Sequence, residues 1–193
     1  KLLFASGSII VQPEGVKATP DGKTVWVTSE ETGTISVLDP ATGKINKTFK
    51  VGHRPRSVAF SPDGKTAYVN AENDGTVVLV DAVKLKMIKP IQLGKAGAVK
   101  PMAVLMSPDG TKLYVSTGRG HRVFTIDTAT NKVEGSVEVG PRPWGIALSP
   151  NGKTLYSANG PSNDISVVDL ATNTVTKKIK AGSSPWGVIA LDR

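Results

Sequence analysis

The sequence predicts an all-β protein that repeats one four-stranded unit, and three observations carry this prediction. A proline returns at spacings of 42, 46, 42 and 42 residues along the 193-residue chain. Short apolar and β-branched runs alternate with turn signals every ~8–12 residues, which is typical of all-β folds. No segment shows the periodicity of an amphipathic helix. The repeated prolines are Pro13, Pro55, Pro101, Pro143 and Pro185.

Each of the first four copies carries the same residue types at the same distances from its proline. An aromatic residue follows after 13 positions, an aspartate after 26 and a glycine after 39. The aromatic residues are Trp26, Tyr68, Tyr114 and Tyr156. The aspartates are Asp39, Asp81, Asp127 and Asp169, and the glycines are Gly52, Gly94, Gly140 and Gly182. Agreement at four positions in four copies indicates a true structural repeat.

The second copy shows how one unit is built. Its first apolar run ends at Ser61-Pro62-Asp63-Gly64-Lys65, where proline fixes φ and glycine accepts a positive φ. A second turn is expected at Asn73-Asp74-Gly75, which is a strong hairpin signal. Asp81 can start a third turn by accepting a hydrogen bond from a backbone N–H two residues on. The strands are expected at residues 57–60, 66–70, 76–80 and 87–93.

Four short strands in ~42 residues match one blade of a β-propeller. The residue two positions after each proline is small, and the next one is β-branched, as an inner strand close to its neighbours requires. We therefore predict four-stranded antiparallel blades, about four and a half of them. Whole blades are expected at about residues 13–54, 55–100, 101–142 and 143–184. A partial closing blade is expected from residues 185–193 together with 1–12.

The repeated residues also resemble a known family. From Pro13 to Gly182 the copies resemble the YVTN-type β-propeller repeat. The resemblance rests on the proline, on Val-Ala-Phe-Ser-Pro-Asp-Gly-Lys, on Tyr-Val, on a Val-Asp end and on Val-Gly. The resemblance implies that residues 1–193 are one propeller domain or the C-terminal part of a larger, seven-bladed ring. The segments 54–56 and 184–188 are most similar to propellers that accompany quinoprotein (PQQ) dehydrogenases. This implies an exported protein, in the periplasm or on the cell surface.

Composition excludes several classes of function. The chain has no cysteine and two histidines, which argues against disulfide scaffolds, thiol catalysis and clustered histidine sites. Its apolar runs are far shorter than the ~18 residues that a membrane-spanning helix needs, so no membrane span is expected. The net charge is +8, but the lysines gather at turns and on outer strands. Such lysines protect exposed edges, so we expect no nucleic-acid partner.

The connection from each glycine to the next proline is the candidate binding site. It links an outer strand to the next inner strand, so these loops are expected to converge on a central funnel. Glu14 is the only acidic residue at the matching positions. Arginine pairs with carboxylates and tryptophan offers a flat apolar face, so the funnel should bind an anionic small molecule or a protein partner. The predicted site residues are Arg54, Arg56, Lys100, Arg142, Trp144 and Trp186.

No catalytic constellation is evident in the sequence. His53 is expected to be an exposed residue of a rim loop and His121 a residue of a surface turn. Apart from the residue next to each proline, Lys17 is the one charged residue of the predicted first strands. These strands therefore offer no carboxylate for an axial metal. We therefore expect no catalytic residue, no metal and no cofactor. The main hypothesis is a non-catalytic binding or scaffolding propeller, and the resemblance suggests a PQQ or quinohaemoprotein system as the one that it serves. The alternative is a haem d1-like cofactor carrier or a lactonase-like enzyme.

Overall fold

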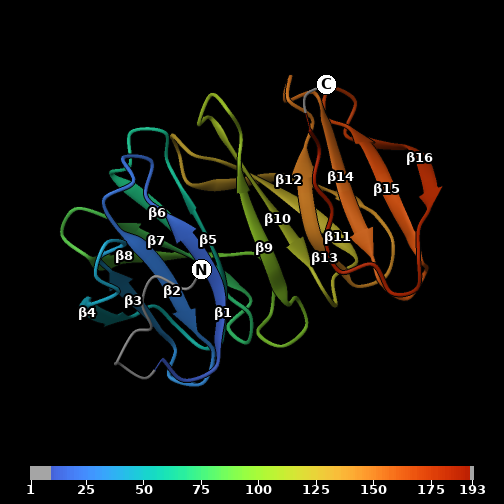
Figure 1. Cartoon of the computed structure of the whole chain (residues 1–193). Helices are drawn as coiled ribbons and strands as arrows, with labels where there is room; N and C mark the ends of the chain where they lie inside the picture. The colour runs from blue at the N-terminus through green and yellow to red at the C-terminus, as the bar shows by residue number, and fades with distance from the viewer. Residues whose placement is uncertain (1–9, 192–193) are drawn as a thin grey trace.

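The computed structural model describes residues 10–191, which form sixteen strands in four sheets (Figure 1). Each sheet contains four antiparallel strands in chain order, so one sheet corresponds to one sequence repeat. Figure 1 shows the sheets following one another from the blue to the red end of the chain. These observations confirm the predicted all-β class and the four-stranded antiparallel blades.

The strands begin and end close to the predicted positions. The first blade consists of β1 (Pro13–Ala18), β2 (Val25–Ser29), β3 (Thr34–Leu38) and β4 (Ile45–Lys50). The second consists of β5 (Pro55–Phe60), β6 (Thr66–Ala71), β7 (Thr76–Asp81) and β8 (Lys86–Gln92). The third consists of β9 (Pro101–Met106), β10 (Lys112–Thr117), β11 (Arg122–Asp127) and β12 (Lys132–Glu138). The fourth consists of β13 (Pro143–Leu148), β14 (Thr154–Asn159), β15 (Asp164–Asp169) and β16 (Thr174–Lys180).

The first strands of successive blades pack directly against one another. β1 contacts β5, β5 contacts β9 and β9 contacts β13. The approach is so close at Gly15 that a Cβ there would lie 2.2 Å from the carbonyl oxygen of Arg56. At Gly145 a Cβ would lie 2.8 Å from the Cα of Gly187. This is the physical reason for small residues two positions after the proline.

The hydrophobic core lies between blades. Three clusters of buried side chains each join two neighbouring blades, one cluster for each blade-to-blade interface. Trp26 of β2 is 1% exposed and packs edge to face on Phe49 and on Phe60 of the next blade, with ring centroids 5.5 and 4.9 Å away. The repeated aromatic residue of the second strand is thus a core residue in the first blade.

The repeated aspartates hold turns. Oδ1 of Asp39 accepts hydrogen bonds from the backbone N–H groups of residues 41 and 42, each at 2.8 Å. Asp127 makes the equivalent contact with Thr130 and also meets the ammonium of Lys112 at 3.1 Å. The N–H and hydroxyl of Thr130, followed by Lys112, stabilise the carboxylate and lower the pKa of Asp127 to about 2. These aspartates therefore serve local structure.

The predicted closing blade would be formed by the two ends of the chain. Residues 1–9 and 192–193 lie outside the described part of the chain, so pairing between the two ends stays a prediction. The segment after residue 184 runs beside β13, where the Gly145 N–H donates to the carbonyl of Trp186 at 3.0 Å. It takes the place of a fifth inner strand. At the other end Val16 of β1 is 69% exposed, because no blade among residues 10–191 covers that face.

Replacement of Gly15 by alanine should destabilise the fold, because the new methyl group would collide with the backbone of β5. We expect a loss of about 1–3 kcal/mol, the usual cost of overpacking. Gly135→Ala is the matched control, since a Cβ at this strand glycine meets nothing within 4 Å. Urea unfolding of both variants measures the difference. Equal stability of the two variants would contradict close packing of the first strands.

Candidate functional site

One face of the blades collects two kinds of loop. On this face, in each of the first three blades, the carbonyl of the residue before the repeated proline accepts a hydrogen bond. The donor is the backbone N–H of the first residue after the second strand of the same blade. Arg54 O accepts from Glu72 N at 3.1 Å, and Lys100 O accepts from Gly118 N at 2.7 Å. The predicted glycine-to-proline loops are therefore held beside the hairpin turns, and side chains from both meet at this face.

The backbone before the prolines is conformationally restricted. Gln12, Arg54, Arg142 and Ser184 occupy equivalent positions and have φ of 46°, 60°, 48° and 48°. A non-glycine residue rarely adopts this left-handed conformation, and such residues cluster at functional sites. Lys100 ends the connection from Gly94 to Pro101, which is longer than the others because the proline spacing there is 46 residues, and Lys100 is not among the positive-φ residues. The fold thus fixes the direction of Arg54 and Arg142.

The structure brings the predicted site residues together. A pocket of about 400 Å³ is lined by five cationic side chains, by the carboxylate of Glu72, by Met102 and by one aromatic ring. Five of the six predicted residues line it, namely Arg54, Arg56, Lys100, Arg142 and Trp144. Trp186 lines a second hollow of about 230 Å³, which shares Arg56 and Trp144 with the first. We call the space of about 400 Å³ the arginine pocket.

Arg56 is the centre of an ion-pair network between the first two blades. Its Nη1 lies 2.9 Å from Oε1 of Glu14 and 2.9 Å from Oε1 of Glu30, and its Nε donates to Oε2 of Glu72. The side chains of Arg56 and Glu72 are only 9% and 5% exposed. Charges so deeply buried are stable only when they are paired and hydrogen-bonded.

Two more cations complete the network. Arg54 Nε lies 2.8 Å from Glu30 Oε2, and Lys100 Nζ lies 3.0 Å from Glu72 Oε1. Burial would raise the pKa of Glu72, but hydrogen bonds from Arg56 and Lys100 outweigh it and hold the pKa below its ordinary value. Burial would lower the pKa of Arg54, but the hydrogen bond to Glu30 and the charge of Glu72 raise it.

This network corrects the prediction that Glu14 is the only acidic residue of a basic and aromatic funnel. Three predicted cations, Arg54, Arg56 and Lys100, face three carboxylates. Glu14 was expected at the funnel, whereas Glu30 and Glu72 were not, because they lie outside the glycine-to-proline connections. Both missed residues follow the second strand and lie 42 positions apart. Their shared position in the repeat is the sequence signal that could have identified Glu30 and Glu72.

Two arginines of the arginine pocket remain without a carboxylate partner in the described part of the chain. Arg142 is exposed, and its Cζ lies 5.1 Å from the centroid of the Trp144 ring. Arg119 is also exposed and reaches only the carbonyl of Gly97, at 3.4 Å. Trp144 packs in turn on Trp186. The pocket therefore offers free guanidinium groups beside an aromatic surface, which suits an anion with an apolar part.

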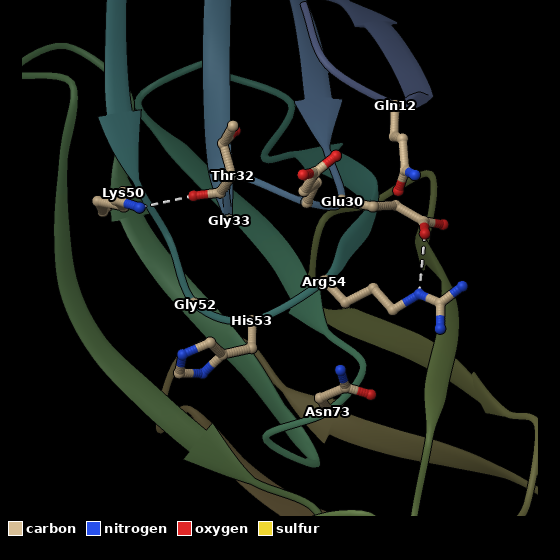
Figure 2. A pocket seen from close by; sticks show the side chains of 10 residues that line it. Gln12, Glu30, Thr32, Gly33, Lys50, Gly52, His53, Arg54 and Asn73 are labelled. Atoms are coloured by element: carbon tan, nitrogen blue, oxygen red, sulfur yellow. Dashed lines mark hydrogen bonds and ion pairs between the residues drawn. The ribbon is translucent and has the colours of Figure 1, made fainter.

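A second pocket of about 730 Å³ lies between the loops of the first two blades (Figure 2). It shares Arg54 with the arginine pocket and is also lined by Lys50, His53 and Asn73. His53 is 83% exposed, as predicted, but its Nδ1 lies 2.7 Å from Oδ1 of Asp74. The sequence analysis did not foresee this pair. We call this space the histidine pocket.

Other predicted features can be placed directly. His121 lies exposed in the turn between β10 and β11, as expected. Among residues 10–191 there is no cluster of three His, Asp or Glu side chains arranged to hold a metal. In the same range no helix could cross a membrane.

Comparison with known proteins identifies the family. Residues 11–184 match the family described as lactonase, 7-bladed beta-propeller. The chain belongs to this family. No curated protein matches it. The finer similarity to YVTN-type and PQQ-associated propellers is not part of this finding.

Several solved structures resemble this lactonase-family chain. Kuenenia stuttgartiensis hydrazine synthase has a TM-score of 0.81 at 25% identity over 94% of this chain and 54% of its own. Putative 6-phosphogluconolactonases from Bacteroides fragilis and Bacteroides uniformis have TM-scores of 0.76 and 0.75. Their identities are 28% and 25%, over 91% and 90% of this chain and 56% of each of theirs. The lactonase-family chain thus spans little more than half the length of these structures.

The family match overturns the main functional hypothesis. A non-catalytic scaffold was expected because the sequence of this lactonase-family chain shows no catalytic constellation and its predicted first strands offer no carboxylate for an axial metal. Membership of a lactonase family and the similarity to putative 6-phosphogluconolactonases point to the enzyme alternative. His53 was expected to be only an exposed loop residue, but it pairs with Asp74 from the turn between β6 and β7, a contact between two segments that lie 21 residues apart.

Replacement of Arg56 by methionine should destabilise the protein by about 3–5 kcal/mol at pH 7, because it leaves Glu72 buried without its main partner. Arg122→Met is the control, since Arg122 is only half-buried and forms a 3.6 Å ion pair with the exposed Glu138, and this variant should cost at most about 1 kcal/mol. Urea unfolding measures both. Equal losses would show that the network contributes no more than a surface pair.

The pH dependence of the same variant is also predicted. The folded pKa of Glu72 is below its ordinary value of 4.5, so the network stabilises the protein above that value. This contribution is lost as the pH falls through the folded pKa. The stability difference between wild type and Arg56→Met should therefore shrink between pH 7 and about pH 3. A difference that stays constant over this range would contradict the role of the carboxylates.

Proposed function

We propose that this chain is part of a lactonase that hydrolyses an anionic sugar lactone, with a phosphorylated lactone of the 6-phosphogluconolactone type as the first candidate. The observation that carries this proposal is the arginine pocket of a lactonase-family chain, in which Arg119 and Arg142 have no carboxylate partner among residues 10–191. The putative activity of the two Bacteroides proteins supports the choice of substrate.

The pocket chemistry supports an anionic group at one end of the substrate. Guanidinium groups bind phosphate and carboxylate through paired hydrogen bonds. Trp144 offers an apolar wall for a sugar ring, and Arg142 lies over its face. A pocket of about 400 Å³ accommodates a small molecule, so we favour such a ligand over an acidic protein surface.

The buried network gives the site its rigidity. Arg54, Arg56 and Lys100 are held by carboxylates from neighbouring loops, so they need little rearrangement when a ligand enters. Arg119 and Arg142 then contribute the free charge. Binding sites held in this way lose less free energy to ordering side chains on association.

We also propose that the protein acts outside the cytoplasm, in the periplasm or at the cell surface. The resemblance of its repeat to YVTN-type propellers supports this location. Fractionation of the producing cells with an antibody to the protein tests it. Recovery with cytoplasmic markers alone would overturn the proposal.

The proposed function predicts that the full protein hydrolyses 6-phosphogluconolactone, and that Arg142→Ala raises KM about tenfold or more with little change in kcat. The loss of one charge-assisted contact to the anion accounts for this effect. A pH-stat assay of acid release measures it. The control is Arg122→Ala, because Arg122 lines neither pocket and should keep the wild-type KM.

The unphosphorylated lactone separates anion recognition from general binding. Wild type should prefer the phosphorylated substrate, and Arg142→Ala should lose most of that preference. If the wild-type protein hydrolyses neither lactone, the proposed function is wrong. If Arg142→Ala and Arg122→Ala behave alike, the arginine pocket is not the anion site.

A further inference from the structure

The pair formed by His53 and Asp74 has the geometry of an oriented base. Both carboxylate oxygens of Asp74 contact His53. Its Oδ2 accepts from the backbone N–H of His53 at 2.8 Å, and its Oδ1 lies 2.7 Å from the ring Nδ1. The contact joins the loop before β5 to the turn between β6 and β7. The two contacts together fix the position of the ring.

The pair also fixes where the ring carries its proton. An ionised carboxylate can only accept hydrogen bonds, so Nδ1 must donate to Asp74. In the neutral ring Nε2 is then the unprotonated nitrogen, with a lone pair free to take a proton. Nε2 of His53 has no hydrogen-bond partner among residues 10–191, and the side chain is 83% exposed. An aspartate that orients a histidine in this way is a recurrent arrangement for general-base catalysis.

The location of His53 gives the base access to a substrate. His53 lines the histidine pocket together with Lys50 and Arg54, as Figure 2 shows. Arg54 also lines the arginine pocket, and Asn73 lines the histidine pocket while its Oδ1 lies 3.4 Å from Lys100 Nζ. The two pockets therefore adjoin at Arg54, Asn73 and Lys100. A general base at His53 requires that an anion held in the arginine pocket extend its other end past Arg54 into the histidine pocket.

We propose that Nε2 of His53 is the general base of lactone hydrolysis and that Asp74 is its positioning residue; this inference rests on the proposed function. Water attacks the lactone carbonyl, a C–O bond forms, and Nε2 takes a proton from the water. The ring C–O bond then breaks, and the imidazolium returns its proton to the leaving ring oxygen. The product is a hydroxy acid, whose carboxyl proton passes to solvent.

The test compares His53→Ala with His121→Ala in the full protein. His121 is the matched control, because it is also exposed and lies in a surface turn, outside both pockets. His53→Ala should lower kcat for 6-phosphogluconolactone by ~10²–10⁴-fold with little change in KM. Added imidazole should restore part of the rate, because it can enter the open pocket. His121→Ala should keep the wild-type kcat and gain nothing from imidazole.

Asp74→Asn provides the test of positioning. Asp74→Asn should lower kcat less than His53→Ala does. Added imidazole should not rescue this variant, because the His53 ring still fills the space that imidazole would enter. An active wild type with a fully active His53→Ala variant would overturn the base assignment while leaving the proposed function intact. A His53→Ala variant that is inactive and not rescued by imidazole would also overturn it.

A second measurement does not depend on turnover. Nitrogen-15 chemical shifts of the His53 ring report which nitrogen carries the proton in the neutral form. We expect Nδ1–H in the wild type and a mixed or inverted tautomer in Asp74→Asn. Protonation of Nε2 in the neutral wild-type ring would overturn the inference. If the tautomer is as expected but no lactone is hydrolysed, the proposed function fails and the base assignment fails with it.

Discussion

The close packing of the first strands is the constraint on which the rest of the structure depends. Successive first strands touch, and at Gly15 and Gly145 there is no room for a side chain. This packing brings the loops before neighbouring prolines onto one face. Arg56 of the second blade therefore reaches Glu14 of the first, and Lys100 of the third reaches Glu72 of the second. The ion-pair network is a consequence of strand packing.

The same network divides the site into two halves of different charge. Residues 30, 72, 118 and 160 occupy one repeat position, just after the second strand. The first two copies carry glutamate there, and the last two carry glycine. Arg54, Arg56 and Lys100 are consequently neutralised, whereas Arg119 and Arg142 stay free in the described part of the chain. A regular scaffold thus produces an asymmetric pocket, with function placed in its loops.

The fold was predictable because the signals that encode it are local and repeated. Turn residues such as Asp39 and spacing between prolines act within one copy, and four copies confirm one another. The convergence of Arg54, Arg142 and Trp144 was predictable for the same reason, since equivalent loops of neighbouring blades must meet. The ion pairs and the His53–Asp74 contact were not predicted. They join residues 16 to 42 positions apart in the sequence, and which side chain reaches which depends on the tertiary structure.

The most direct test of this account is an NMR titration of the protein with 6-phosphogluconate, the hydroxy acid expected as product. The account predicts saturable shift changes at Arg119, Arg142 and the Trp144 indole, extending through Arg54 to His53, and weaker binding of unphosphorylated gluconate. Shift changes confined to the exposed outer strands, or no difference between the two acids, would contradict it.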